Sequence, residues 1–267
     1  MINILELISK EKAKGYSESN AESKVCQDII LLALSKSTLN RNVTIKGGVV
    51  MRSKTNNIRR ATQDLDIDFI KYSLSNESID KFIFKLNCIE NLYINRVGGI
   101  EELSQQDYHG KRVFIQIKDK YDNVLNNKID LGVHNHFEIS QEEYCFDISL
   151  NDEGASLLIN SNEQMFVEKL RSLLKFGPLS TRYKDIFDMC YLSKRVNTDI
   201  LKVCLNIYIF EDQGMRENTI EDVIKRLKFT FKDKMYLRRL KTTDKNWLNE
   251  EIEAVLNEII LLFTSLC

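Results

Sequence analysis

The sequence predicts an α+β protein in which a mixed sheet with flanking helices is followed by an all-helical C-terminal domain. Alternating and β-prone runs occur only before about residue 155, and beyond about residue 160 apolar residues recur at the 3.6-residue helical period. Hydrophobic residues make up 43% of the chain, enough for buried cores, and the single proline, Pro178, argues against Pro-rich linkers. We therefore expect an α/β domain over residues 1–155 and a helical domain over residues 156–267.

Helices and short strands alternate in the first half. Apolar stripes at helical spacing predict helices at residues 2–12, 20–35 and 77–89. The β-prone run 43–45 leads straight into Gly47-Gly48 and another apolar turn, so we expect a strand that passes directly into a short helix. Period-2 alternation predicts strands at residues 65–70, 92–97, 112–117 and 128–134, with a further candidate at 144–148.

The second half has the pattern of a helical domain. Helices are expected near residues 162–176, 182–195, 198–210, 218–232 and 245–265. No stretch approaches the roughly 18 apolar residues of a membrane span, and Glu6 and Lys10 interrupt the N-terminus too early for a secretory signal. The six cysteines form no C-x-x-C motif, which is typical of free thiols in a reducing compartment. We expect a cytoplasmic protein with no membrane partner.

Three acidic residues mark the strand at 65–70. Asp64, Asp66 and Asp68 are two residues apart, so on a strand they project from one face. Like charges so arranged repel one another, and a solvated outer face is the simplest structural explanation. The apolar residues between them indicate instead a strand that is packed into a core. Carboxylates aligned on a rigid strand suit Mg²⁺ or Mn²⁺, which binds carboxylate and phosphate oxygens.

A phosphate-binding pattern precedes this strand. Gly47 and Gly48 allow backbone N–H groups to approach a phosphate closely, and a helix that starts there adds positive partial charge. Basic residues that could neutralise a triphosphate follow at Arg52, Lys54, Arg59 and Arg60. The glycines, the bases and the acidic strand together predict one site for a nucleoside triphosphate and a metal ion.

Two segments resemble motifs of the AbiEii/AbiGii toxin family of bacterial type IV toxin–antitoxin and abortive-infection systems. Residues 46–52 and 60–66 are similar to G-[GS]-x-x-x-R and R-x-[TS]-x-D-h-D, where h is hydrophobic. Lys169 is followed by residues 182–188, RYKDIFD, which match R-x-K-D-x-x-D. The family often has Glu five residues before the helical Lys, where this chain has Gln164 next to Glu163. Residues 200–267 match no motif of the family.

The resemblance implies a minimal, polymerase-β-like nucleotidyltransferase fold that transfers a nucleoside monophosphate from an NTP and releases pyrophosphate. It implies catalytic roles for Asp64, Asp66, Lys169 and Asp185, and metal binding by Asp64, Asp66 and Asp130. It implies NTP binding by Gly47, Gly48, Arg52, Thr62, Lys169, Arg182, Lys184 and Asp188. Its partners would be a cognate antitoxin and an RNA acceptor, with a tRNA 3′ end favoured.

The role of Asp185 stays open between three readings. It could orient Lys169, or it could act as a base on the attacking hydroxyl. The structural alternative is that Asp185 and Asp188, three residues apart on one helix face, only stabilise the helix N-terminus.

Residues 225–241 hold eight basic residues and one acid, interleaved with Phe229, Phe231 and Tyr236. This pattern fits RNA, with cations on phosphates and rings that stack on bases, or a solvated helix face with the rings in the core. The candidate RNA contacts are Lys225, Arg226, Lys228, Lys232, Arg238 and Arg239.

Other functions remain open at this stage. The formal net charge of -1 gives no global attraction to nucleic acid. The chain could instead modify a protein hydroxyl, bind an NTP without turnover, or serve as a helical partner-binding protein whose acidic strand lies on the surface.

Overall fold

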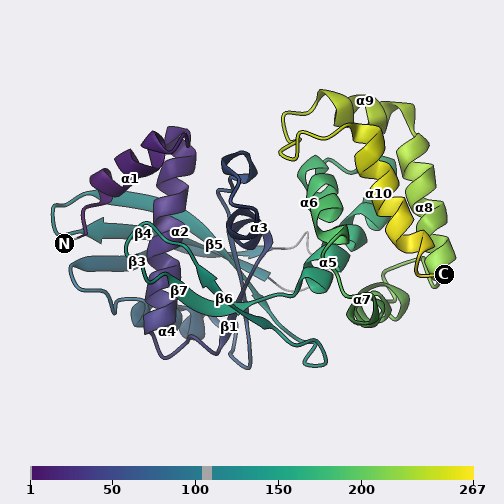
Figure 1. Cartoon of the computed structure of the whole chain (residues 1–267). Helices are drawn as coiled ribbons and strands as arrows, with labels where there is room; N and C mark the ends of the chain where they lie inside the picture. Colours follow the sequence, from purple (N-terminus) through teal and green to yellow (C-terminus); the bar gives the residue numbers. More distant parts are fainter. Residues whose placement is uncertain (1, 104–109) are drawn as a thin grey trace. The chain divides into compact units, whose positions relative to one another are not determined.

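The chain divides into two compact units, Met1–Asn160 and Ser161–Cys267. The computed structural model describes residues 2–103 and 110–267. Each unit has its own secondary structure, a sheet with helices in the first and helices alone in the second (Figure 1). The expected α+β class is confirmed. The boundary that we expected after residue 155 falls inside β7 (Ala155–Ile159), which pairs with β1 and β6 in the sheet of the first unit.

The first unit is built on a mixed sheet in the order β3-β4-β5-β2-β1-β7-β6. Strands β2 and β5 are parallel, as are β1 and β7, and the other neighbours are antiparallel. Besides β7, the strands are β1 (Val43–Lys46), β2 (Leu65–Phe69), β3 (Leu92–Leu103), β4 (Gly110–Asp119), β5 (Val124–Val133) and β6 (Glu142–Phe146). Strand β2 therefore lies in the interior of the sheet, between β5 and β1.

Helices cover this sheet, and the first and last of them begin at side-chain caps. The helices are α1 (Ile4–Ala13), α2 (Glu18–Lys36), α3 (Gly47–Thr55), a 3₁₀ turn (Ile58–Arg60) and α4 (Asn76–Lys85). Asn3 accepts the N–H groups of Leu5 and Glu6 at the start of α1, which stabilises that helix end. Helix α2 is buried around its whole circumference from Val25 to Leu34, and Figure 1 shows it crossing the face of the sheet. It forms the centre of the core of this unit.

The second unit is helical in all its regular structure. It comprises α5 (Asn162–Phe176), a 3₁₀ turn (Gly177–Leu179), α6 (Tyr183–Ser193), α7 (Thr198–Leu205), a π turn (Asn206–Phe210), α8 (Ile220–Lys232), α9 (Lys234–Thr242) and α10 (Ile252–Thr264). Helix α10 packs on α6 and α8, and α5 packs on α6 and α7. Phe166, Phe187 and Phe263 are fully buried between them. Gly177 and Pro178 end α5.

The structure adds two elements that we did not expect. Strand β7 has only five residues and lies just before α5, so in the sequence it resembles a linker between the two domains. Helix α9 begins one residue after α8, because the side chain of Asp233 accepts the N–H of Tyr236 and caps a new helix. The helix expected from residue 245 begins only at Ile252, because Asn249 has a left-handed backbone with φ 60°.

The length and apolar character of the helices decide whether any of them could cross a membrane. Over residues 2–103 and 110–267, none is both long enough and apolar enough to span a bilayer.

Candidate active site

The acidic residues of β2 lie next to Asp130. The register pairs Asp66 with Lys46 of β1 on one side and with Asp130 of β5 on the other. Side chains of directly opposed residues point to the same face of a sheet, so the Asp66 and Asp130 carboxylates are neighbours. Asp64 lies just before β2, and Asp68 lies two residues after Asp66. The three residues named as metal ligands therefore come from one small region of the sheet.

This arrangement changes the acidity of Asp66. Burial raises the pKa of the Asp66 carboxyl, Lys46 lowers it, and the negative charges of Asp130, Asp64 and Asp68 raise it further, to about 6. A carboxylate that is held this far above its ordinary pKa gains free energy from a nearby cation. Such a group in a charged cluster is typical of functional sites.

The neighbouring acids each pair with a base from an adjacent strand. Lys128 lies 2.8 Å from Asp64, and Lys46 lies 2.8 Å from Asp68. Arg112 of β4 donates two hydrogen bonds of 2.8 Å each to the carboxylate of Asp130. The negative charge of the cluster is thus balanced from β1, β4 and β5, and the guanidinium fixes the orientation of Asp130.

Glycines let the start of α3 approach the acidic strand. Strand β1 passes into α3 at Gly47, which has a left-handed backbone with φ +67°. A Cβ at Gly47 would collide with the carboxylate of Asp66, and a Cβ at Gly48 would collide with the side chain of Thr62. The expected strand–glycine–helix unit is therefore present, with its N-terminal N–H groups beside Asp66 and Thr62. A helix start of this kind favours bound phosphate.

Arg52 lies elsewhere, inside a buried network. Only 5% of it is exposed, and it donates hydrogen bonds to Gln27 and, at 3.4 Å, to Asp28. Asp28 also accepts from Lys24 at 2.5 Å and from the backbone N–H and hydroxyl of Ser149 at 2.9 and 2.6 Å. These contacts join α2 and α3 to the segment that follows β6. The structure gives Arg52 a packing role, and its contact with an NTP stays a prediction.

The second unit gathers the residues of the other motif. The Nζ of Lys169 on α5 lies 2.9 Å from Asp185 and 2.9 Å from Asp188 on α6. The Nε of Arg182 lies 2.6 Å from the other oxygen of Asp185. Lys169, Asp185 and Asp188 are buried, while most of the Arg182 side chain is exposed. Lys184 follows half-buried on the first turn of α6.

Trp247 completes this cluster and was not singled out from the sequence. Its indole N–H donates to Asp188 at 3.0 Å, and both residues are buried. Lys169 and Trp247 thus bind the two oxygens of one fully buried carboxylate. No motif covers residues 200–267, so no motif could point to Trp247. Two facts could have done so: it is the single tryptophan of the chain, and a buried carboxylate needs several hydrogen-bond donors.

The two residues at the start of α5 have separate structural partners. Gln164 is buried and donates to Glu168 at 3.0 Å and to the hydroxyl of Tyr208 at 2.9 Å. Glu163 accepts the backbone N–H of Asn197 at 2.7 Å, just before α7. The acid next to Gln164 therefore helps to anchor the start of another helix.

The donor set at the sheet fits a hard divalent cation. Across residues 2–103 and 110–267, no three His, Cys, Asp or Glu side chains are grouped as a metal site. Mg²⁺ usually takes one or two carboxylates and completes its coordination with water and substrate phosphate oxygens. The adjacent Asp66 and Asp130, whose mutual repulsion raises the pKa of Asp66, supply such carboxylates.

The basic region of residues 225–241 is divided between core and surface. Phe231 and Tyr236 are buried, whereas Phe229 is 60% exposed. Lys225, Lys228 and Lys232 are exposed on α8, and Arg238 and Arg239 are exposed on α9. Arg226 is half-buried, and its Nε donates to the carbonyl of Leu174 at 3.1 Å.

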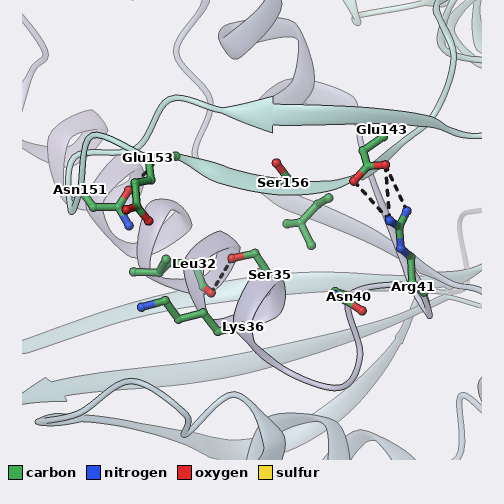
Figure 2. Close-up of a pocket in the computed structure, with 11 residues that line it drawn as sticks. Leu32, Ser35, Lys36, Asn40, Arg41, Glu143, Asn151, Glu153 and Ser156 are labelled. Carbon is green, nitrogen blue, oxygen red and sulfur yellow. Dashed lines mark hydrogen bonds and ion pairs between the residues drawn. The ribbon is translucent and has the colours of Figure 1, made fainter.

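A polar hollow of about 320 Å³ lies in the first unit between α2 and the strands β6 and β7. Figure 2 shows Arg41 and Glu143 paired at its rim, with a closest distance of 3.3 Å, and Lys36, Asn151 and Glu153 farther along the wall. None of the motif residues is among those that line it.

The motifs noted in the sequence agree with a comparison to known protein families. The chain belongs to the family described as "Nucleotidyl transferase AbiEii toxin, Type IV TA system", which it matches over residues 29–258. This match confirms the resemblance noted in the sequence, and a nucleotidyltransferase toxin is therefore the class to which the chain is assigned.

Other comparisons add little. No curated protein sequence matches the chain. Among solved structures it is similar to an antigenic nucleotidyltransferase-like protein from Paracoccidioides brasiliensis, with 14% identity over 81% of this chain and 94% of that one. The TM-score of this match is 0.43.

Replacing Asp66 by Asn should stabilise the protein at neutral pH. The pKa of Asp66 is about 6 in the folded state against an ordinary 3.8, so ionisation of Asp66 opposes folding. We expect Asp66→Asn to unfold at higher urea concentration than the wild type above pH 6. The difference should shrink as the pH falls from 6 towards 4, where wild-type Asp66 takes up its proton. A gain that is the same at every pH would contradict the assigned cause.

Replacing Gly48 by Ala tests the contact between α3 and Thr62. The new methyl group would overlap the Thr62 side chain, so we expect a loss of about 1–3 kcal/mol in the free energy of unfolding. Gly99→Ala is the matched control, because a Cβ there meets no atom of the described chain within 4 Å. Equal stability of the two variants would show that the start of α3 is not tightly packed.

Trp247→Phe keeps an aromatic ring and removes the donor to Asp188. We expect a loss of about 1–3 kcal/mol in the free energy of unfolding, since a buried carboxylate loses one hydrogen bond. Urea titration of the single variants and of the double variant with Asp188→Asn forms a double-mutant cycle. If the two substitutions simply add, the indole does not act through Asp188.

Proposed function

We propose that this nucleotidyltransferase transfers a nucleoside monophosphate from an NTP to an RNA acceptor, with a tRNA 3′ end as the favoured acceptor. The supporting observation is the pair Asp66 and Asp130 beside the glycine-initiated helix α3, because it combines ligands for a cation with N–H groups for a phosphate. The RNA acceptor comes from the resemblance to the toxin family and from the basic surface of the second unit.

The reaction needs positioning and charge neutralisation more than covalent chemistry. A hydroxyl of the acceptor attacks the α-phosphorus and loses its proton to solvent, the bond to the β-phosphate breaks, and pyrophosphate leaves with the bonding electrons. Asp64, Asp66 and Asp130 would hold Mg²⁺ or Mn²⁺, which neutralises the phosphate charge when bound. Gly47 and Gly48 would direct backbone N–H groups at the phosphates, with the Thr62 hydroxyl beside them.

The buried cluster of the second unit has a proposed role of its own. In this proposal Lys169 contacts phosphate oxygens, and Arg182, Lys184 and Asp188 bind or orient the nucleotide. Asp185 lies 2.9 Å from the Lys169 ammonium, a geometry that favours the orienting role over that of a proton acceptor. Arg52, which is enclosed by Gln27 and Asp28, would support α3 from behind.

The family also defines the setting of this activity. A member of a type IV toxin–antitoxin family is expected to have a cognate antitoxin. We propose that the chain acts in the cytoplasm, where NTPs and RNA acceptors are available, and that its antitoxin neutralises it there.

Asp64→Ala and Asp66→Ala should reduce label transfer from an α-labelled NTP to background. Either substitution removes a carboxylate from the cation-binding group while the core residues of β2 are retained. The assay mixes each variant with total RNA, Mg²⁺ and one labelled NTP at a time, and circular dichroism verifies folding. Asp199→Ala, which alters an exposed acid on α7, is the control and should label like the wild type.

The same assay, run with cell extract in place of total RNA and with NTP binding measured alongside, separates the rival functions. Label that migrates with protein would point to modification of a protein hydroxyl instead of RNA. Magnesium-dependent NTP binding without release of pyrophosphate would point to a binding module that lacks turnover. Wild-type labelling by both aspartate variants would refute the catalytic assignment.

A further inference from the structure

Helix α8 presents one exposed stripe of cations around an aromatic ring. Its buried side consists of Val223, Leu227, Thr230 and Phe231. Lys225, Lys228, Phe229 and Lys232 are exposed and are spaced three, four and seven residues apart, so they share one side of the helix. We call the surface formed by Ile224, Lys225, Lys228, Phe229 and Lys232 the α8 face.

Two shallow hollows lie beside Phe229 on this surface. One groove of about 440 Å³ is lined by the α8 face and Glu221. A second of about 350 Å³ is lined by Arg216, Glu217, Asp222 and Arg226 together with Lys225 and Phe229. Because the ring of Phe229 is 60% exposed beside these two grooves, a flat group could lie against it.

Arg226 lies against this ring. Its guanidinium lies 5.7 Å from the centre of the Phe229 ring, within the range of a cation–π contact. Its Nε donates to the carbonyl of Leu174 at 3.1 Å. A Cβ at Gly177 would collide with the same guanidinium, so Arg226 is closely packed. Arg226 is therefore a positioning residue for Phe229, whose side chain stays largely exposed.

The charge of the α8 face selects an anionic partner. In the described part of the chain, none of Lys225, Lys228 and Lys232 takes part in an ion pair, and Glu221 is the acid that lines their groove. Single-stranded RNA offers bases that stack on an exposed ring and phosphates that attract flanking lysines. An acidic protein would pair with the lysines, but a nucleobase also offers a flat face to the exposed ring of Phe229.

We propose that the α8 face is the docking surface for a single-stranded segment of the RNA acceptor. One base stacks on the exposed ring of Phe229, and Lys225, Lys228 and Lys232 contact the phosphates on either side. This inference rests on the proposed function, since it specifies how the acceptor of that reaction is bound.

The test measures binding of a short fluorescein-labelled single-stranded RNA by fluorescence anisotropy with the full chain. Phe229→Ala should weaken binding about tenfold or more, and Phe229→Tyr should restore it, because the loss of one stacked base is costly. Phe84→Ala is the matched control, since Phe84 is 78% exposed on α4 and should leave RNA affinity unchanged.

Salt dependence tests the lysines separately. The triple substitution Lys225→Gln, Lys228→Gln and Lys232→Gln should lower the slope of log affinity against log salt by about 2, as expected for three lost phosphate contacts on a single strand. Lys202→Gln, on the exposed side of α7, serves as the control and should leave the slope unchanged.

The outcomes distinguish this surface from the transfer reaction. Reduced RNA binding by Phe229→Ala supports the docking surface even if no label is transferred, in which case the proposed function alone fails. Unchanged RNA affinity in both the Phe229→Ala and the triple lysine variants would overturn the docking surface, whatever the labelling assay shows. If these variants lost binding to an acidic peptide but bound RNA like the wild type, the proposed RNA docking surface would likewise be overturned.

Discussion

The close contact between the start of α3 and the carboxylate of Asp66 constrains the first unit more than any other. It requires a residue without a side chain at Gly47, a strand that ends where the helix begins, and a partner strand in register at Asp66. Because the same register places Asp130 on the other side of Asp66, the sheet accumulates negative charge in its interior. Basic residues on β1, β4 and β5 offset that charge. Their presence on the surrounding strands is therefore a consequence of the close contact between α3 and Asp66.

The first motif carries residues of two kinds. Gly47, Gly48 and Asp66 meet at the sheet, whereas Arg52 is buried and donates a hydrogen bond to Asp28 on α2. Asp28 also binds Ser149, so the segment that leads to β7 is held by the same network. The packing and the chemistry of this motif depend on each other, because a loosened α3 would no longer present its N–H groups at the acidic strand.

The period of the apolar residues predicted the α+β class, and the spacing of the glycines and acids predicted the site at β2, because both patterns report on local structure. The residues of the second motif were named from the resemblance to the toxin family. Asp130 could be named only by resemblance, since strand register is a nonlocal property that no spacing encodes. Strand β7 and helix α9 were missed because each adjoins its neighbour with almost no intervening residue. Trp247 was missed because its partner, Asp188, is 59 residues earlier in the chain and no periodicity links them.

The hydrogen bond between Trp247 and Asp188 also makes Trp247 an intrinsic fluorescent probe of this cluster. Since Trp247 is the single tryptophan, all indole emission of the protein arises from one ring that is bonded to the buried Lys169–Asp188 pair. Any rearrangement of that cluster, through a bound nucleotide or a bound antitoxin, alters the polarity around one fluorophore. The chain thus reports on the state of its second motif without a label attached to it.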